Sequence, residues 1–595
     1  MRVMRVGAES RTGLPAAPSH GGQIVASVLV KRRVPALFTL CGGHISPILV
    51  GATEAGIPVV DCRDEKSAVF AADAVARMTG APGVAAVTAG PGVTNSLTAL
   101  KNAQLAQSPV VLIGGATATV LKGRGALQDI DQMGLVASAT KWTARCTTLA
   151  QIEPVLERAF YVAASGVPGP VFVELPVDLL YPEAVVREWY LKEAGRVNPK
   201  TIAGKAIHLY LRGHLERQFH LPHLEVGGLP RDRRPRPVLE ARLEEAAQLL
   251  RHAERPALVV GSQAMVNCRD PAPLARAIER LGVPTWLGGM ARGLLGRRGE
   301  LQFRHARASA LKEADVAIVC GFPFDFRLKY GMGFGRSTRV VAANLSAAEL
   351  RKNRRPDVAL RMPPAELLLR LAERVAPAPS WRSWVAACTE RETARDEEIA
   401  ASAKSDGGLV DPIHLLGRLE EKLDDDSIIV ADGGDFVATA AYVLRPRAPL
   451  SWLDPGVFGT LGVGGGFAVG AATLRPRSEI WILYGDGSSA YSLAEFDTFV
   501  RHGLAPIAIV GTDGAWGQIA RDQTKLLGSG VGTALLRTAY HRVAEGYGGV
   551  GLLLDDPARV DDVLDEAKAV RRSGRPVCVN VHLATTEFRE GSISI

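Results

Sequence analysis

The amino-acid sequence predicts an α/β protein made of three doubly wound parallel-sheet domains. Short apolar runs alternate with helical patterns along most of the chain, which is typical of parallel strands covered by helices on both faces of a sheet. The chain has 595 residues, and at roughly 100–200 residues per domain this length predicts about three to five domains. Because 47% of the residues are hydrophobic, the chain can build real cores and is not a disordered scaffold.

Three α/β blocks are separated by polar or irregular segments. The first block, residues 20–182, has expected strands at 36–40, 58–60, 84–88, 110–113 and 171–175 and helices at 66–78 and 93–106. The second, residues 238–375, has an apolar helical stripe at 239–250 and strands at 257–260 and 316–320. The third, residues 409–595, has strands at 428–430, 480–484, 507–510 and 577–581 and helices at 493–501 and 563–570. The other segments are a flexible N-terminal tail (1–19), a basic insert (183–237) and a linker (376–408). Blocks one and three share a similar rhythm of elements.

The formal net charge is +8 and is unevenly distributed. Residues 1–35 and residues 183–237 each carry +5, so the rest of the chain carries −2. This excess permits an anionic partner but is too small for the chain's size to indicate nucleic acid. Within the insert, Ile207, Leu211, Leu215 and Phe219 recur every four residues, which predicts an amphipathic helix. The helix either packs on the protein body, contacts a membrane surface or partner, or forms a substrate lid.

The seven cysteines are dispersed and never form a Cys-X-X-Cys pair. This arrangement argues against a disulfide framework or a structural zinc site and fits a reducing compartment. The sequence has no run of 18 apolar residues and no apolar signal core near its first residues. We therefore expect a cytoplasmic protein.

Two aspartates follow neighbouring strands of the third block. Asp486 lies in Gly485–Asp486–Gly487 after the strand at 480–484, and Asp513 follows the strand at 507–510, 27 residues later. If the two strands are adjacent and parallel, both carboxylates meet at one sheet edge, where they repel unless a cation lies between them. Oxygen ligands suit Mg²⁺, and nearby glycines let backbone N–H groups approach a phosphate. These residues predict a magnesium-bridged diphosphate site; the alternative is two unrelated turn aspartates.

This spacing resembles the thiamine diphosphate motif, which runs from Gly-Asp-Gly to an asparagine some 27 residues later. The resemblance implies that Mg²⁺ binds Asp486, Asp513 and the backbone carbonyl of Ala515, although Asp513 stands where the family has asparagine. The segment 458–467 is similar to the same family, which implies that the Gly459 carbonyl accepts from the cofactor's 4′-amino group and that Leu461 is the apolar wedge. The remaining cofactor contacts that the resemblance implies are Gly434, Asp435, Gly485, Gly487 and Ser488.

The chemistry of thiamine diphosphate enzymes also needs a carboxylate beside the pyrimidine ring of the cofactor, and the candidate is Glu65. It ends the sequence Asp61-Cys-Arg-Asp-Glu65, after a strand and at the start of a helix. The family resemblance implies that Glu65 hydrogen-bonds N1′ of the ring and supports its proton transfer. The alternative is that Glu65 only stabilises a helix N-terminus.

The wider sequence resembles the acetolactate synthase-like group of thiamine enzymes. Segments 84–95 and 169–176 carry group-wide signatures, and segments 288–296, 452–456 and 495–502 are similar to the acetolactate synthase-like proteins of the 2-hydroxyacyl-CoA lyase group. The sequence Gly42-Gly43-His44-Ile45 resembles a benzaldehyde lyase motif. That likeness implies that His44 relays protons and that Gln128 helps to bind the reacting oxygen. The alternative for His44 is a satisfied polar residue at a strand end.

These resemblances imply pyrimidine-binding, middle and diphosphate-binding domains, and a thiamine diphosphate-dependent carbon–carbon lyase or ligase. The first expectation is a reversible 2-hydroxyacyl-CoA lyase, which forms an aldehyde and formyl-CoA. The alternative is an acetolactate synthase or a benzaldehyde lyase-like carboligase acting on 2-keto acids or acyloins. Trp516 and Gln518 are expected to line the substrate pocket.

The middle domain of the relatives binds ADP, as part of CoA, or FAD. Here the turn after its first strand, Gly261-Ser262-Gln263, lacks the lysine of the CoA-handling relatives. Arg292, Arg304 and Arg307 are the candidates for that role, and binding of a vestigial FAD is the alternative. The resemblance also implies a homodimer or homotetramer with active sites at the subunit interface. From the small excess of charge we expect no nucleic-acid partner, and the alternative is an electrostatic nucleic-acid or membrane binder that uses the two basic segments. A catalytically silent cofactor-binding subunit is a further alternative, against which the presence of Glu65 argues.

Overall fold

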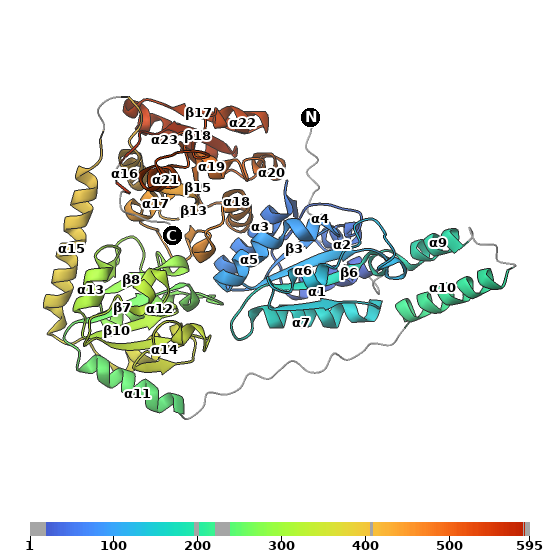
Figure 1. Cartoon of the computed structure of the whole chain (residues 1–595), viewed down its shortest axis with the longest axis horizontal. Coiled ribbons are helices and arrows are strands. Elements are labelled where there is room, and N and C mark those ends of the chain that lie inside the picture. Colours follow the sequence, from blue (N-terminus) through green and yellow to red (C-terminus); the bar gives the residue numbers. More distant parts are fainter. Residues whose placement is uncertain (1–19, 195–200, 221–237, 405–407, 587, 590–595) are drawn as a thin grey trace.

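The computed structural model describes residues 20–194, 201–220, 238–404, 408–586 and 588–589. Three six-stranded sheets, each with all its strands parallel, form three α/β domains (Figure 1). The predicted fold class is confirmed. The expected N-terminal tail, residues 1–19, lies outside the described residues.

The first domain has the strand order β2-β1-β3-β4-β6-β5. Its strands are β1 (Leu37–Thr39), β2 (Val59–Asp61), β3 (Gly83–Val87), β4 (Val110–Ala116), β5 (Trp142–Arg145) and β6 (Val171–Pro176). Its helices are α1 (Gly21–Lys31), α2 (Ser46–Glu54), α3 (Glu65–Thr79), α4 (Pro91–Asn95), α5 (Leu97–Ala106), α6 (Gln132–Val136), α7 (Ile152–Ala164) and α8 (Val177–Leu180). All of β3, β4 and β6 is buried, as their apolar runs predict.

The helix expected at 93–106 is split at Ser96 into α4 and α5. The Ser96 hydroxyl donates to the carbonyl of Gly92 at 2.8 Å, and its N–H bonds the carbonyl of Val93 at 3.2 Å. Serine side chains compete in this way with regular helical bonding, which the apolar pattern of the segment did not reveal.

The middle domain has the strand order β12-β11-β10-β7-β8-β9, which is the doubly wound order of nucleotide-binding folds. Its strands are β7 (Pro256–Val260), β8 (Thr285–Leu287), β9 (Gln302–Phe303), β10 (Val316–Cys320), β11 (Arg339–Ala343) and β12 (Val358–Leu360). Its helices are α11 (Val238–Arg251), α12 (Ala272–Leu281), α13 (Arg307–Glu313) and α14 (Pro364–Arg374). The segment expected as a linker contains the long helix α15 (Trp381–Ala401).

The third domain has the strand order β14-β13-β15-β16-β18-β17, which repeats the order of the first domain strand for strand. Its strands are β13 (Ile428–Asp432), β14 (Trp452–Leu453), β15 (Ile480–Gly485), β16 (Ile507–Thr512), β17 (Val550–Leu554) and β18 (Val577–His582). Its helices are α16 (Pro412–Lys422), α17 (Gly434–Val443), α18 (Val463–Leu474), α19 (Asp486–Ser489), α20 (Glu495–His502), α21 (Gly517–Leu527), α22 (Tyr540–Gly546) and α23 (Val560–Arg572). Short 3₁₀ helices occupy Thr119–Leu121, Leu149–Gln151, Ser262–Ala264, Gly289–Ala291, Phe326–Gly331, Glu349–Arg351, Gly456–Phe458 and Pro557–Arg559.

The first and third domains share one hydrophobic core through α3 and α18. Gly470 allows the two helices to approach closely, because a Cβ there would lie 2.3 Å from the carbonyl oxygen of Ala71. The rings of Phe70 and Phe467 meet edge to face at 5.6 Å. This packing fixes the position of Glu65, the first residue of α3, relative to the third domain.

The insert forms a pair of helices, α9 (Glu183–Ala194) and α10 (Ile202–His220), which extend from the first domain at one end of the molecule (Figure 1). An ion pair of 3.1 Å between Arg187 and Glu216 joins them. Helix α10 lies where the spacing of apolar residues predicts a helix, and of that stripe Leu215 is buried whereas Ile207 is 38% exposed. Helix α9 was not expected. Among the described residues, no helix is both long and apolar enough to span a membrane.

Candidate active site

Asp486 and Asp513 lie at the same sheet edge, as the sequence predicts. Strands β15 and β16 are adjacent and parallel, with Gly485 opposite Gly511. Asp486 begins α19 and is only 2% exposed. Its Oδ1 accepts from the N–H of Gly487 at 2.8 Å, and its Oδ2 accepts from the N–H of Gly514 at 2.9 Å. The loop after β16 therefore holds the carboxylate in place.

The electrostatics of this edge favour a cation. Burial, and secondly the charge of Asp513, raise the pKa of Asp486 to about 6. Burial also raises the pKa of Asp513. A buried carboxylate whose ionisation is opposed by a second, partly buried carboxylate forms with it a donor set that a divalent cation stabilises. The residues present thus fit Mg²⁺.

Glycines shape the backbone around this edge. Gly433 and Gly434 have positive φ angles of 73° and 82°, which turn the chain sharply from β13 into α17. A Cβ at Gly433 would lie 2.5 Å from the side chain of Leu461. The turn presents the N-terminus of α17 to the cavity, and a helix N-terminus favours a phosphate group. The loop therefore fits the diphosphate end of the predicted cofactor.

Asp432 is a buried residue of this site that the sequence analysis missed. Its Oδ1 accepts from the N–H of Gly462 at 3.0 Å, and its Oδ2 accepts from the N–H of Gly464 at 2.7 Å. Burial raises the pKa of Asp432 to about 7. Asp432 thereby fixes the chain that carries Gly459 and Leu461. The sequence signal was an aspartate at the end of an apolar strand, directly before two glycines.

A cavity of about 600 Å³ collects the candidates of the third domain together with Arg292. This volume is typical of a small-molecule site. Trp516 packs on the Gly485–Asp486–Gly487 turn, since a Cβ at Gly487 would lie 2.4 Å from its ring. The candidates on the cavity wall are Gly434, Asp435, Gly459, Leu461, Gly485, Asp486, Gly487, Ser488, Asp513, Ala515, Trp516, Gln518 and Arg292.

Arg292 reaches this cavity from the middle domain. Its guanidinium stacks over the ring of Trp452 at 4.3 Å and donates to the carbonyl of Ala441. Burial lowers the pKa of Arg292 to about 10. Asp435, at the start of α17, is paired with Arg521, another contact that the sequence did not predict.

The three candidates of the first domain lie around the segment 88–95. His44 Nδ1 is 3.3 Å from the hydroxyl of Thr88. Glu65 is buried and accepts from Asn95 Nδ2 at 3.0 Å. Gln128 has a positive φ of 63° and packs on Gly90, where a Cβ would lie 2.9 Å from that of Gln128.

None of these three residues lines the 600 Å³ cavity, whose described wall contains no residue of the first domain. The structure thus gathers the candidates into two groups, one on the first domain and one on the third. Burial lowers the pKa of His44, so its imidazole is neutral near pH 7.

A second cavity, of about 660 Å³, lies mainly in the middle domain. It shares five wall residues with the first: Gly289, Arg292, Phe326, Arg327 and Ala441. None of its described lining residues is acidic, whereas six are arginine or lysine: Arg292, Arg304, Arg307, Arg327, Lys329 and Arg395. Such a wall fits an anionic ligand.

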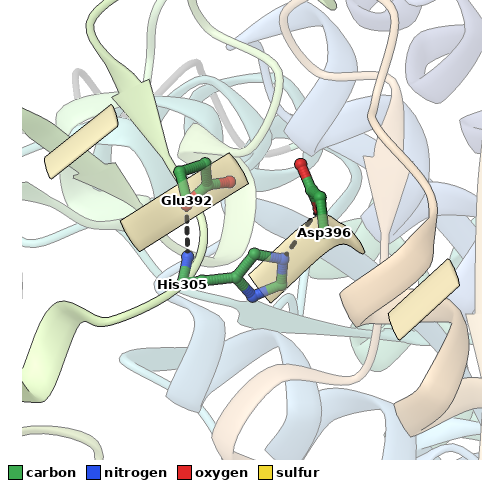
Figure 2. Close-up of side chains that lie close together, drawn as sticks. All are labelled: His305, Glu392 and Asp396. Carbon is green, nitrogen blue, oxygen red and sulfur yellow. Dashed lines mark hydrogen bonds and ion pairs between the residues drawn. The ribbon is translucent and has the colours of Figure 1, made fainter. Parts of the chain in front are cut away.

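Arg304 is held by an ion-pair network at the edge of this second cavity. Figure 2 shows His305 between Glu392 and Asp396, two residues of α15. The backbone N–H of His305 donates to the carboxylate of Glu392 at 2.8 Å, and the ring nitrogen Nε2 of His305 is 3.2 Å from Asp396 Oδ1. Arg304 pairs with both carboxylates, so the three side chains of Figure 2 join α15 to the middle domain and do not need a metal ion.

Known proteins align with this chain over nearly all of its length. It is 46% identical over 592 residues to 2-hydroxyacyl-CoA lyase 2 of Danio rerio, which covers 97% of this chain and 94% of the relative. It is 49% identical over 596 residues to 2-hydroxyacyl-CoA lyase 2 of Caenorhabditis elegans, covering 97% and 91%. It is 34% identical over 571 residues to acetolactate synthase large subunit IlvG of Mycobacterium tuberculosis, covering 95% and 96%.

Three segments of this chain also match the three domains of one protein family, in the same order along the sequence. Residues 19–135 match the thiamine pyrophosphate enzyme N-terminal TPP binding domain, residues 243–371 the central domain, and residues 432–581 the C-terminal TPP binding domain. The chain belongs to the thiamine pyrophosphate enzyme family. This membership confirms the predicted family, the enzyme class that depends on this cofactor, and thiamine diphosphate as the cofactor. Each match lies within one of the three domains of the structure.

Proposed function

We propose that this thiamine pyrophosphate enzyme is a 2-hydroxyacyl-CoA lyase. It breaks the C1–C2 bond of a 2-hydroxyacyl-CoA and releases an aldehyde and formyl-CoA, and the reverse reaction joins them. The observation that carries the proposal is the continuity of two cavities, a cofactor-sized one and a basic one, which share Arg292 and Arg327. The names of the relatives from Danio rerio and Caenorhabditis elegans support the same activity.

Asp486, Asp513 and the carbonyl of Ala515 are the proposed Mg²⁺ ligands, and the turns at Gly434 and Gly487 hold the diphosphate. The cofactor supplies a nucleophilic carbon for bond cleavage or formation next to a carbonyl group. Leu461, held by the turn that Asp432 fixes, supports the cofactor's bent shape. Asp513 in place of the family's asparagine adds a negative charge that favours the cation.

In this proposal, residues of the first domain carry out the proton transfers. The Glu65 carboxylate holds a proton at N1′ of the pyrimidine ring, and Asn95 orients Glu65. His44 takes the proton from the C2 hydroxyl of the substrate, a step for which a neutral imidazole is required. That hydroxyl becomes the aldehyde, and a proton is returned to C1 to give the formyl group. Gln128 orients the reacting oxygen.

The basic cavity binds the nucleotide end of CoA. Its position beside the middle domain's doubly wound sheet agrees with the general location of nucleotide sites in such folds. Arg307 and Lys329 face the phosphates, whereas Arg304 is committed to Glu392 and Asp396. Because Arg292 and Arg327 line both cavities, the thioester end can reach the cofactor.

A homodimer or larger oligomer completes the active site. The cofactor cavity has no described wall residue from the domain that carries Glu65. We therefore assign Glu65 and His44 of one subunit to the cofactor bound by its partner.

A second candidate function is acetolactate synthesis from 2-keto acids, which the 34% identity to acetolactate synthase large subunit IlvG favours. The basic cavity would then bind the ADP part of FAD. A bound flavin would give an absorbance band in the purified protein, which separates this candidate from the first.

The test is turnover with thiamine diphosphate and Mg²⁺. Wild type should form formyl-CoA from a 2-hydroxyacyl-CoA, and Glu65→Gln should not. Pyruvate is offered in parallel, because acetolactate would form only if the second candidate is correct. Equal formyl-CoA from both proteins would exclude the assigned role of Glu65.

A further inference from the structure

Helices α9 and α10 line one side of a third cavity, of about 790 Å³, beside His44. The cavity is open to solvent, since Leu127 and Tyr210 on its wall are 83% and 51% exposed. Most of its wall is apolar and comes from the loop after β4 and from the two helices; Val120, Leu121, Leu127, Ile207 and Leu211 are examples. None of the described wall residues is acidic, and the titratable or charged ones are His44, Arg124, Tyr190 and Tyr210. The cavity therefore suits a hydrocarbon group and not a charged ligand.

Buried polar contacts attach α10 to the first domain. Asp178 accepts from the hydroxyl of Thr119 at 2.6 Å, and the same hydroxyl lies 2.7 Å from Nε2 of His214 on α10. Asp178 also accepts from the hydroxyl of Tyr190 on α9. These contacts hold both helices over the cavity in a fixed position.

A second contact links the helices to the loop that carries His44. The hydroxyl of Tyr181, just before α9, donates to the carbonyl of Gly43 at 3.0 Å. The ring of Tyr181 also packs on Trp189 at 5.0 Å, and Trp189 lines the cavity. Tyr181 thus connects helix α9, which lines the cavity, to the loop that carries His44, the candidate proton acceptor.

One segment of the chain both lines the cavity and carries a candidate residue of the active site. The segment 117–128 supplies Val120, Leu121 and Leu127 to the cavity wall and then reaches Gln128. His44 stands at the cavity and at the site. A substrate whose C2 hydroxyl meets His44 would place the carbon chain attached to C2 at the mouth of this cavity.

We propose that this cavity binds the hydrocarbon chain of the 2-hydroxyacyl substrate and of its aldehyde product, and that α9 and α10 set the preferred chain length. The proposal rests on the proposed lyase function. The volume lies within the range of about 300–1,000 Å³ typical of ligand sites. Each methylene that is fully buried favours binding by about fourfold, so a long chain gains far more from this cavity than a short one.

The test compares four-carbon and sixteen-carbon 2-hydroxyacyl-CoA substrates in three proteins. Ala206 lines the cavity from α10, and Ala206→Trp fills it. Ala203 lies on the same helix, is exposed and does not line the cavity, so Ala203→Trp is the matched control. Ala206→Trp should lower kcat/KM at least tenfold for the long substrate and less than twofold for the short one. Ala203→Trp should change neither by more than twofold.

A binding measurement separates this proposal from the lyase function. A sixteen-carbon aldehyde, which contains no CoA, should change the fluorescence of Trp189, measured as the difference between wild type and Trp189→Phe. If wild type cleaves no acyl-CoA but the aldehyde signal is present and lost in Ala206→Trp, the lyase function fails and the cavity assignment stands.

Three outcomes would overturn the assignment. The first is an equal effect of Ala206→Trp on both chain lengths, and the second is an unchanged Trp189 signal with the aldehyde. The third is retention on phosphatidylcholine vesicles that Ala206→Trp abolishes while the chain-length profile stays that of wild type. That third result would identify a membrane surface as the occupant of the apolar wall.

Discussion

The charge of Asp513 opposes the ionisation of Asp486 at the ends of two adjacent parallel strands. Burial, and to a smaller extent the charge of Asp513, raises the pKa of Asp486 to about 6. Backbone N–H groups fix both oxygens of Asp486, one from Gly487 in α19 and one from Gly514 in the loop after β16, so the carboxylate cannot turn away. A divalent cation bound between the two residues, as proposed above, would remove this repulsion and would couple proton binding, metal binding and stability.

The first prediction is that Mg²⁺ affinity depends on pH around 6. A cation must displace the proton of Asp486, so the apparent affinity for Mg²⁺ should rise about tenfold between pH 5 and pH 7. Calorimetric titration of Mg²⁺ into protein saturated with thiamine diphosphate measures this dependence. An affinity that is constant between these pH values would contradict the assignment of Asp486 as a ligand.

A related effect on stability has a defined sign. The pKa of Asp486 is higher in the folded protein than the ordinary value of 3.8, so the folded state binds more protons between pH 4 and 6. Stability from this group is present at low pH and is lost as the pH rises through about 6. At pH 7.5, metal-free Asp486→Asn should be more stable than metal-free wild type by up to about 3 kcal/mol. Saturating Mg²⁺ should stabilise wild type but not the variant.

The second prediction concerns the contact between Asn95 and Glu65. Asn95→Leu removes the donor to Glu65 Oε2, so we expect kcat to fall about tenfold with the dissociation constant of thiamine diphosphate changed less than threefold. Glu65→Gln should lower kcat much further. Steady-state kinetics and cofactor titration measure both quantities. Asn95→Asp is the informative comparison, because it keeps the shape of the side chain but places a second carboxylate beside Glu65. It should lower kcat further than Asn95→Leu does.

The sequence predicted the parts of the fold that local patterns determine. The five apolar residues at 316–320 correspond to β10, and the Gly-Asp-Gly turn marks the end of β15. Strands β9 and β14 have two residues each, which is too short for an apolar run or an alternation to appear. Strand β5 is half-buried at the sheet edge, and its mixed sequence gave no signal.

The site was predicted where its residues match a family motif or follow neighbouring strands, and missed where only tertiary contacts bring the residues together. Asp486 and Asp513 follow strands that are neighbours in sequence and in the sheet. Asp432 binds N–H groups 30 and 32 residues away, and Asn95 reaches Glu65 across 30 residues. No local spacing encodes such pairs. The cavity beside α9 and α10 was missed for the same reason, since the loop after β4 and the two helices come together around it only after folding.

The third prediction concerns the ion pairs of Asp396. Burial opposes its ionisation, but the hydrogen bond from His305 and the charges of Arg304 and Arg445 lower its pKa to about 2. This carboxylate therefore stabilises the fold fully above about pH 4, and its contribution is lost as the pH falls towards 2. Asp396→Asn should lower the free energy of unfolding by about 1–2 kcal/mol at pH 7, discounted for its partial exposure. The difference from wild type should shrink as the pH falls from 4 to 3.

Urea midpoints at several pH values measure this effect. Glu397→Gln, an exposed neighbour on the same helix, is the matched control and should change the midpoint very little. A difference between wild type and Asp396→Asn that stays constant down to pH 3 would refute the ion-pair explanation.

The fourth prediction is that Lys329 contributes to binding of acyl-CoA. It lies on the wall of the basic cavity, and one hydrogen bond to a charged phosphate is worth about 1.5–3 kcal/mol. Lys329→Gln should therefore raise KM for acyl-CoA at least tenfold and leave kcat nearly unchanged. Lys312, an exposed residue of the same domain outside the cavity, provides the control Lys312→Gln. Equal KM values for the two variants would exclude a nucleotide site at Lys329.

The fifth prediction tests whether Glu65 and Asp486 act in different subunits. Glu65→Gln and Asp486→Asn homodimers should each be inactive. If each site combines Glu65 of one subunit with Asp486 of its partner, a mixed dimer has one site with both substitutions and one intact site. Unfolding and refolding an equal mixture should then restore about one quarter of wild-type activity, because about half of the dimers are mixed and each has one active site of two. If both residues act within one chain, every chain carries a damaged site and no activity returns. Refolding each variant alone measures the background.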